Sequence, residues 1–166
     1  MYYINSLYFY SLIGFIMEST VYKISKSKRH SGICYGPYTF VYGFGVLFLI
    51  LLKKYFLDRL KINKYYKILV TFILCVVVLT FVEWLGGNIL NIVFDIDMWD
   101  YSNIKPNFGK YICLQNSIIW GILGTIYIHI FKVFTDKIIK AITYKETYLF
   151  LTIFIIDMIL VLINKL

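Results

Sequence analysis

Five apolar stretches, each close to the length of a membrane-spanning helix, set the strongest limit on what this chain can fold into. They cover approximately residues 2–22, 36–52, 68–87, 112–134 and 148–163. A helix needs about 20 apolar residues to cross the hydrocarbon core of a bilayer. Because each stretch is continuously apolar rather than alternating, a transmembrane β-barrel is excluded. The sequence therefore predicts an all-α, polytopic bundle of about five transmembrane helices, with residues 1–166 forming a single domain.

Charged residues lie mostly in the short segments between these stretches. Hydrophobic residues make up 60% of the chain and charged residues only 16%, which is not the composition of a soluble domain. The net charge of +8 could suggest a nucleic-acid partner, but a nucleic-acid site needs its Lys and Arg gathered on one surface. Here they flank the apolar stretches, as topology-setting residues do. We therefore expect contact with a lipid bilayer and no nucleic-acid partner.

The basic residues also predict an orientation. Segments 53–67 and 132–145 together carry ten Lys and Arg, whereas the first and third connecting segments carry six. Cytoplasmic segments are usually the more basic ones. We therefore expect the N-terminus and these two basic segments inside the cell, and the acidic third segment outside it.

The third connecting segment has the most unusual composition of the chain. Residues 95–102 contain three acids within six positions, next to a Trp and a Tyr. The preceding residues, 88–94, are amphipathic enough for a short interfacial or re-entrant helix, and a long loop is the alternative. Gly86 and Gly87 are expected to end or loosen the third helix before this point.

Polar and aromatic residues gather on the side of the membrane that carries this segment. Glu18 and Glu83 each lie about one turn from the expected end of an apolar stretch. A carboxylate costs roughly 2.5–3.5 kcal/mol at a helix centre, so we expect the bundle interior for both, with an interfacial Glu18 as the alternative. This predicts a cavity between the helices. Its expected lining is Glu18, Gly36, Pro37, Tyr42, Glu83, Trp84, Trp99, Asp100, Tyr101, Asn107, Asn116 and Trp120.

The third connecting segment is expected to fold inward over this cavity. Trp99 and Tyr101 would close its mouth, with Asp100 hydrogen-bonded below them. Two nearby carboxylates repel each other, which favours a shared proton or a cationic partner. The candidates for that cation nearest in sequence are Lys23, Arg29 and Lys110.

Several kinds of site are missing from the sequence. There is no G-x-x-x-x-G-K-[ST] motif, so we expect no ATPase on this chain, and no catalytic motif is recognisable. Cys34, Cys75 and Cys113 lack metal-ligand spacing, and we expect no metal and no cofactor. A disulfide between Cys34 and Cys113 is left open. Asp157, inside the fifth stretch, is expected to pair with a neighbouring helix or to face a cavity.

A series of short motifs resembles a known family over residues 8–125. The motifs are Gly14-Phe-x-x-Glu18, Gly36-Pro37, Tyr42-Gly43, Glu83-Trp84, Trp99-Asp100-Tyr101-Ser102, Asn107, Ile112-Cys113-Leu114, Ser117 and Trp120-Gly121. Their order and spacing are similar to those of small bacterial membrane proteins in the family named "Putative ABC-transporter type IV". The resemblance implies a multi-pass, permease-like protein of the bacterial cytoplasmic membrane, and a separate ATPase as its partner.

The sequence is compatible with three functions. The favoured one is a transport or solute-binding component for an unknown small solute or lipid, which works with the separate ATPase or as a homo-oligomer. The second is an intramembrane enzyme acting on a lipid or peptide, with Glu18 or Glu83 as general base and Asp100 as an orienting group or metal ligand. The third is a structural or regulatory membrane subunit.

Overall fold

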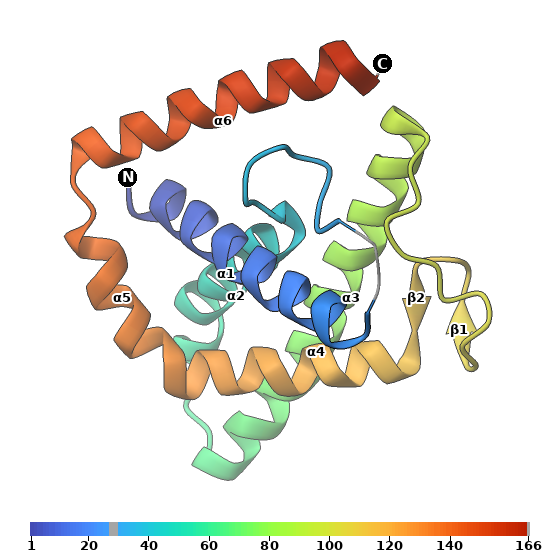
Figure 1. The fold of residues 1–166 in the computed structure, drawn as a ribbon. Coiled ribbons are helices and arrows are strands. Elements are labelled where there is room, and N and C mark those ends of the chain that lie inside the picture. Colours follow the sequence, from blue (N-terminus) through green and yellow to red (C-terminus); the bar gives the residue numbers. More distant parts are fainter. Residues whose placement is uncertain (27–29, 166) are drawn as a thin grey trace. The chain divides into compact units, whose positions relative to one another are not determined.

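The computed structural model describes residues 1–26 and 30–165, and it confirms the all-α class. A short 3₁₀ helix spans Leu57–Arg59, and a π-helical turn spans Tyr127–Phe131. The helices are α1 (Tyr2–Ile24), α2 (Phe40–Tyr55), α3 (Lys64–Phe94), α4 (Leu114–Ile126), α5 (Lys132–Ala141) and α6 (Tyr144–Lys165) (Figure 1). The strands are β1 (Asn107–Phe108) and β2 (Ile112–Cys113).

Within the described residues, four helical stretches are long and apolar enough to cross a membrane. They are Phe40–Arg59, Lys64–Phe94, Leu114–Ala141 and Tyr144–Asn164. Helix α1 has 23 residues, which is enough length, but its buried residues include the polar Asn5, Ser6 and Ser11. The chain is therefore an all-α membrane protein in which α1 is the least apolar of the five long helical stretches.

Helix boundaries differ from the sequence-based expectation in α3. It continues through Gly86 and Gly87 to Phe94, so residues 88–94 are its last turns rather than a separate helix. Glycine lowers helix stability by about 1 kcal/mol, a cost that packing offsets here. A Cβ on Gly87 would lie 2.6 Å from Cγ of Tyr111, so only glycine leaves room for that ring. The helix ends at Asp95, whose left-handed backbone donates its N–H to the Asn91 and Leu90 carbonyls.

The basic segment 132–145 was expected to be a loop and is mostly helix. The π-helical turn continues α4 into α5, and only residues 142 and 143 separate α5 from α6. Helix α2 likewise begins at Phe40, because residues 31–39 form an irregular connection rather than a first helical turn.

The chain divides into two compact units, Met1–Val46 with Asp136–Leu166, and Leu47–Thr135. In the first unit, aromatic packing joins α1 to α6. The Tyr8 ring stacks on Phe150 with a centroid separation of 5.5 Å, and the Tyr8 hydroxyl donates to the Phe150 carbonyl. Tyr8, Cys34 and Tyr38 form the buried core of this unit.

In the second unit, α3 packs closely against α4. A Cβ on Gly121 would lie 2.4 Å from Cγ2 of Val76, and one on Gly124 would lie 3.0 Å from the Cys75 side chain. Small residues at such positions allow two membrane helices to approach each other. The antiparallel β1–β2 hairpin, in which Asn107 pairs with Cys113, leads directly into α4 (Figure 1).

Candidate functional site

Glu83 is a buried carboxylate between α3 and α4. Its exposed fraction is 5%, and the Tyr101 hydroxyl donates a 2.9 Å hydrogen bond to Oε1. The indole of Trp120, on α4, lies beside the same carboxylate. Among the described residues, no side chain or backbone group makes a hydrogen bond of normal geometry to Oε2. The Tyr101 hydroxyl and the Trp120 indole are therefore the two groups that stabilise this buried carboxylate, and Oε2 is the oxygen without a hydrogen bond of normal geometry.

Tyr101 is positioned by the hairpin that follows it. Its N–H donates to the Lys110 carbonyl at 2.7 Å, and its own carbonyl accepts from Nδ2 of Asn107 at 2.9 Å. The Asn116 side chain, in the first turn of α4, lies beside the Tyr101 hydroxyl. Burial, followed by the Glu83 carboxylate, raises the pKa of the Tyr101 phenol above its usual range. Tyr101 is therefore a protonated hydrogen-bond donor to Glu83 at neutral pH.

Trp99 supplies a second buried polar atom at this end of α3. Its indole Nε1 has no hydrogen-bond partner among residues 1–26 and 30–165. The Trp99 ring contacts Tyr111 edge-on at 6.3 Å between centroids, and Tyr111 packs on Gly87, one turn after Glu83. A buried polar group without a partner costs about 1–3 kcal/mol, which a bound water or polar ligand would offset.

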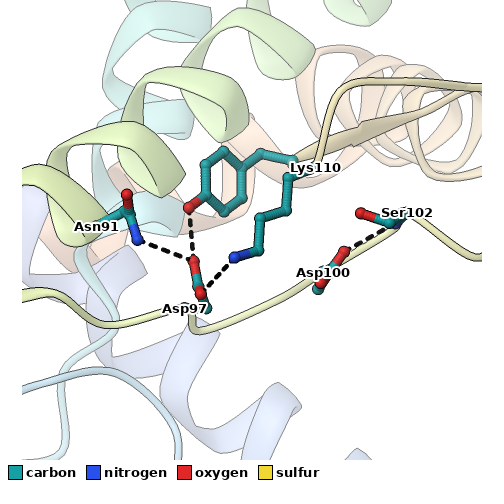
Figure 2. Close-up of polar contacts among 6 residues, drawn as sticks. Asn91, Asp97, Asp100, Ser102 and Lys110 are labelled. Atoms are coloured by element: carbon teal, nitrogen blue, oxygen red, sulfur yellow. Dashed lines mark hydrogen bonds and ion pairs between the residues drawn. The ribbon is translucent and has the colours of Figure 1, made fainter.

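Asp97 is the centre of a polar network at the rim of the second unit (Figure 2). The Lys110 ammonium forms an ion pair with Oδ2. The Tyr111 hydroxyl donates to Oδ1 at 2.6 Å, and the Asn91 amide donates to it at 3.2 Å. The network joins the start of the connecting segment to its end and to the last turn of α3. It therefore closes the segment into a loop over the end of this helix.

The charges of this network stabilise one another. The Lys110 hydrogen bond, helped by Tyr111, lowers the pKa of Asp97, and the same contact raises the pKa of Lys110. Partial burial and the Asp97 carboxylate raise the pKa of Tyr111 to about 12. Asp97 is therefore ionised and the other two groups are protonated at neutral pH.

Asp100 does not take the position expected from the sequence. Its side chain is exposed, and its carboxylate accepts a 2.8 Å hydrogen bond from the N–H of Ser102, apart from the Asp97 network (Figure 2). This contact is an Asx turn, which aspartate forms with its own backbone two residues on. The expectation of Asp100 hydrogen-bonded beneath Trp99 and Tyr101 is therefore wrong. Asp100 shapes the loop instead.

Trp84 and Asn107 lie on a different surface from Glu83. Trp84 follows Glu83 in sequence, so it points about 100° away around the helix, and 39% of its surface is exposed. It lines an open groove on the surface of the second unit together with Asn107. The residues of the second unit that were predicted to line one cavity are thus divided. Some surround Glu83, and others line this groove.

In the first unit, Glu18 is held by two hydroxyls. The Ser31 hydroxyl donates to Oε2 at 2.6 Å and the Tyr22 hydroxyl to Oε1 at 2.8 Å. Ser31 also shares a 2.6 Å hydrogen bond with the Thr39 hydroxyl. Glu18 therefore anchors the connection between α1 and α2.

Gly36 contacts Asp157, the acid inside α6. The N–H groups of Tyr35 and Gly36 each donate to one oxygen of the Asp157 carboxylate at 2.9 Å. Asp157 is 6% exposed, so this pair of hydrogen bonds satisfies it in the interior of the unit. Asp157 was expected to pair with a neighbouring helix or to face a cavity. Its partners are instead backbone N–H groups of the irregular connection, and Pro37 beside them is exposed.

Tyr42 packs against α1 at Gly14. A Cβ on Gly14 would lie 2.3 Å from Cγ of Tyr42, so the ring occupies the space that a side chain would need. In the same way, Gly43 lies against Ser11, whose Oγ would be 2.2 Å from an added Cβ. The motifs around Gly14 and Tyr42 therefore describe a single helix–helix contact.

The predicted cationic partners are not ion-paired with the glutamates. Lys110 pairs with Asp97, Lys23 is exposed, and Arg29 lies outside the described residues. Neither Glu18 nor Glu83 forms an ion pair with a residue that the structure describes. Cys34, Cys75 and Cys113 form no disulfide with one another, so the pairing of Cys34 with Cys113 that the sequence left open is not made.

Sequence reasoning missed Asn91, Asp97 and Tyr111 as one network. Asp97 was noticed only as one of three clustered acids, and nothing in local spacing pairs it with residues 13 and 14 positions later. A Lys-Tyr pair directly before an apolar stretch is also typical of an interfacial anchor. Of the predicted lining residues, four lie in the first unit and eight in the second. A single cavity lined by both groups stays a prediction.

Span-length apolar helices, with buried carboxylates that accept hydrogen bonds from hydroxyl and backbone donors, define an all-α membrane protein. The chain belongs to the family described as "Putative ABC-transporter type IV", whose family model matches residues 6–164. The match confirms the resemblance inferred from the motifs and extends it through α6. No curated protein and no solved structure gives a significant match to the chain.

Proposed function

We propose that this protein is a multi-pass, permease-like component of a transporter in the bacterial cytoplasmic membrane, and that it works with a separate ATPase. Membership of an ABC-transporter family supports the transport role. Because the chain has no phosphate-binding loop, ATP hydrolysis has to be supplied by another subunit. Five long helical stretches make a small permease, which favours assembly with that subunit or with a second copy.

The observation that carries the proposal is Glu83, a buried carboxylate whose Oε2 lacks a hydrogen bond of normal geometry within the described residues. A carboxylate that is 5% exposed is costly within an apolar helix pair and is retained where it has a task. Oε2 can accept a hydrogen bond of normal geometry from a polar group of a solute, and the indole of Trp99 can donate one. The proposed ligand is thus a small solute with at least one hydrogen-bond donor, bound between α3 and the connecting segment.

Tyr101 gives this site a means of opening. Its hydroxyl links the loop to Glu83 through one 2.9 Å hydrogen bond, while Asp97 and Lys110 link the loop to itself. Release of the Tyr101 contact would free both oxygens of Glu83 without disrupting the Asp97 network. The loop would then control access to the carboxylate from the outer side.

The test is solute uptake by the assembled transporter. The tagged chain is purified from native membranes with its associated subunits and reconstituted into vesicles. ATP-dependent accumulation of solutes from a cell extract is then measured by mass spectrometry. We expect one class of polar solutes to accumulate, and we expect Glu83→Gln to abolish this accumulation. Asp58→Asn, which changes an exposed carboxylate of the same unit, is the matched control and should leave it unchanged.

Other outcomes separate the alternatives. If no ATPase activity accompanies the chain and a lipid or peptide is cleaved instead, the protein is an enzyme. If a complex forms and Glu83→Gln lowers only its thermal stability, Glu83 has a structural task and the protein is a structural or regulatory subunit. ATP hydrolysis by the chain alone would contradict the requirement for a partner.

A further inference from the structure

An open apolar groove lies on the surface of the second unit and has no role in the proposed solute site. Its volume is about 640 Å³. One wall is a stripe of α3 that includes Val77, Phe81 and Trp84, and the other is formed by the hairpin and the start of α4, including Phe108 and Leu114. These side chains are exposed in the isolated chain, so the groove is accessible from outside the protein.

The groove lies at the depth of lipid tails. Tyr66 lies in the first turn of α3, and Trp84 lies 18 positions further along this apolar helix. At 1.5 Å per residue this is about 27 Å, close to the roughly 30 Å thickness of the hydrocarbon core. Tyr and Trp are typical at both interfaces of a membrane. Trp84 therefore stands at headgroup level, and Val77 and Phe81 lie on the acyl-chain side of it.

The rim of the groove carries a positive charge. The Lys105 ammonium donates a 2.9 Å hydrogen bond to Oδ1 of Asn107, and Asn107 itself lines the groove. Within the described residues, no carboxylate lies within ion-pair distance of Lys105. The amide therefore holds an uncompensated cation at the polar end of an apolar channel.

Thr80 lines the groove one turn below Trp84. The Thr80 hydroxyl is buried and has no hydrogen-bond partner in the part of the chain that the structure describes. A helical threonine usually satisfies its hydroxyl with the carbonyl four residues earlier, as Thr71 does with Lys67 at 2.7 Å. Because this hydroxyl is buried, it is not presented to a ligand in the groove.

We propose that this groove binds one anionic phospholipid of the surrounding bilayer. An acyl chain lies along Val77 and Phe81, the Trp84 ring stands beside the glycerol region, and Lys105 pairs with the phosphate. A phospholipid fits the combination of an apolar channel at tail depth and an unpaired cation at headgroup depth. A partner helix would fill the channel but would leave Lys105 without a counter-charge.

The test measures lipid retention by the full chain. The protein is reconstituted with equimolar phosphatidylglycerol and phosphatidylcholine, extracted in mild detergent, and analysed by native mass spectrometry. We expect one retained phosphatidylglycerol per chain. Lys105→Gln should lower the preference for it over phosphatidylcholine by about fivefold, as expected for one lysine near an anionic headgroup. Lys61→Gln, an exposed lysine elsewhere in the same unit, is the matched control and should leave the preference unchanged.

A second variant tests the apolar part of the groove. Val77→Trp would fill the channel, and it should reduce retention of both lipids while circular dichroism reports unchanged helix content. Equal retention of the two lipids by the unmodified chain would overturn the proposal. It would also be overturned if Lys61→Gln and Lys105→Gln lowered the preference equally, or if Val77→Trp dissociated a dimer without changing lipid retention. Loss of the transport activity in the Glu83→Gln variant has no bearing on these results.

Discussion

The Tyr101 hydroxyl donates a 2.9 Å hydrogen bond to Glu83, so a residue of the α3–α4 connection contacts the buried carboxylate of α3. The two residues are 18 positions apart, and the loop between them is closed by the ion pair of Asp97 and Lys110. A single polar contact therefore joins the connecting loop to the helix pair. Loops are in general more mobile than the helices they connect.

Removing the Tyr101 hydroxyl should destabilise the second unit. Tyr101→Phe would leave Oε1 of Glu83 without its donor, and an unsatisfied buried acceptor costs about 1–3 kcal/mol. Thermal unfolding in nanodiscs, followed by circular dichroism, would report the change as a lower midpoint. Tyr65→Phe, at an exposed tyrosine of α3, is the matched control. Equal midpoints for the two variants would show that the Tyr101 contact contributes nothing.

The Asp97 network should make the connecting loop sensitive to acid. The pKa of Asp97 is lowered in the folded protein, so its contribution to stability is present above the unfolded value of about 3.9. That contribution is lost as the pH falls through the lowered pKa. The rate of amide hydrogen exchange in residues 95–113, corrected for the intrinsic rate at each pH, should therefore increase at the lowest pH values.

Asp97→Asn should show the faster exchange already at pH 7, with a much weaker pH dependence. Asp58→Asn changes another exposed ion pair, with Lys53, and should leave exchange in residues 95–113 as it is in the unmodified chain. If Asp97→Asn exchanged like the unmodified chain at every pH, the network would not hold the loop.

The connecting loop should lie outside the cell. In a chain whose three cysteines are replaced by alanine, Ser102→Cys should react with a membrane-impermeant maleimide added to intact cells. Lys61→Cys should react only after the membrane is opened. Labelling of position 61 from outside, with position 102 protected, would reverse the orientation and move the Glu83 site to the cytoplasmic side.

The N-terminus tests whether α1 crosses the membrane. The distribution of basic residues predicts an internal N-terminus, which requires α1 to span. Because α1 is the least apolar of the long helical stretches, this is the weakest span by composition. An epitope before Met1 should be protected from added protease in intact cells. Cleavage of that epitope would show that α1 lies on the outer side.

The helical class and the environment of Glu83 could be predicted from the sequence because both follow from local composition. Long apolar stretches have few alternatives to membrane helices, and a glutamate within one has to face protein or water. The same reasoning correctly brought Tyr101 close to Glu83. It placed Trp84 there too, although the helical period separates neighbouring residues by about 100°.

Contacts between distant segments could not be predicted in this way. Asp157 binds backbone N–H groups 121 and 122 positions earlier, and no local pattern encodes that pairing. The continuation of α3 through Gly87 depends on the Tyr111 ring, which occupies the space beside the glycine. The predicted position of Asp100 was wrong because the cluster of acids suggested a buried site. The Asx turn that Asp100 forms instead involves only the next two residues.

The most direct test of the account is a density map of the purified complex in nanodiscs at a resolution that shows bound water and solutes. If the proposed solute site is correct, the map shows density for a polar group within hydrogen-bond distance of Oε2 of Glu83. The Tyr101 hydroxyl is still hydrogen-bonded to Oε1. The Glu83→Gln complex should lack the solute while keeping the helices in place. A Glu83 side chain that faces lipid, or an unmodified complex with no polar group at Oε2, would contradict the proposed solute site.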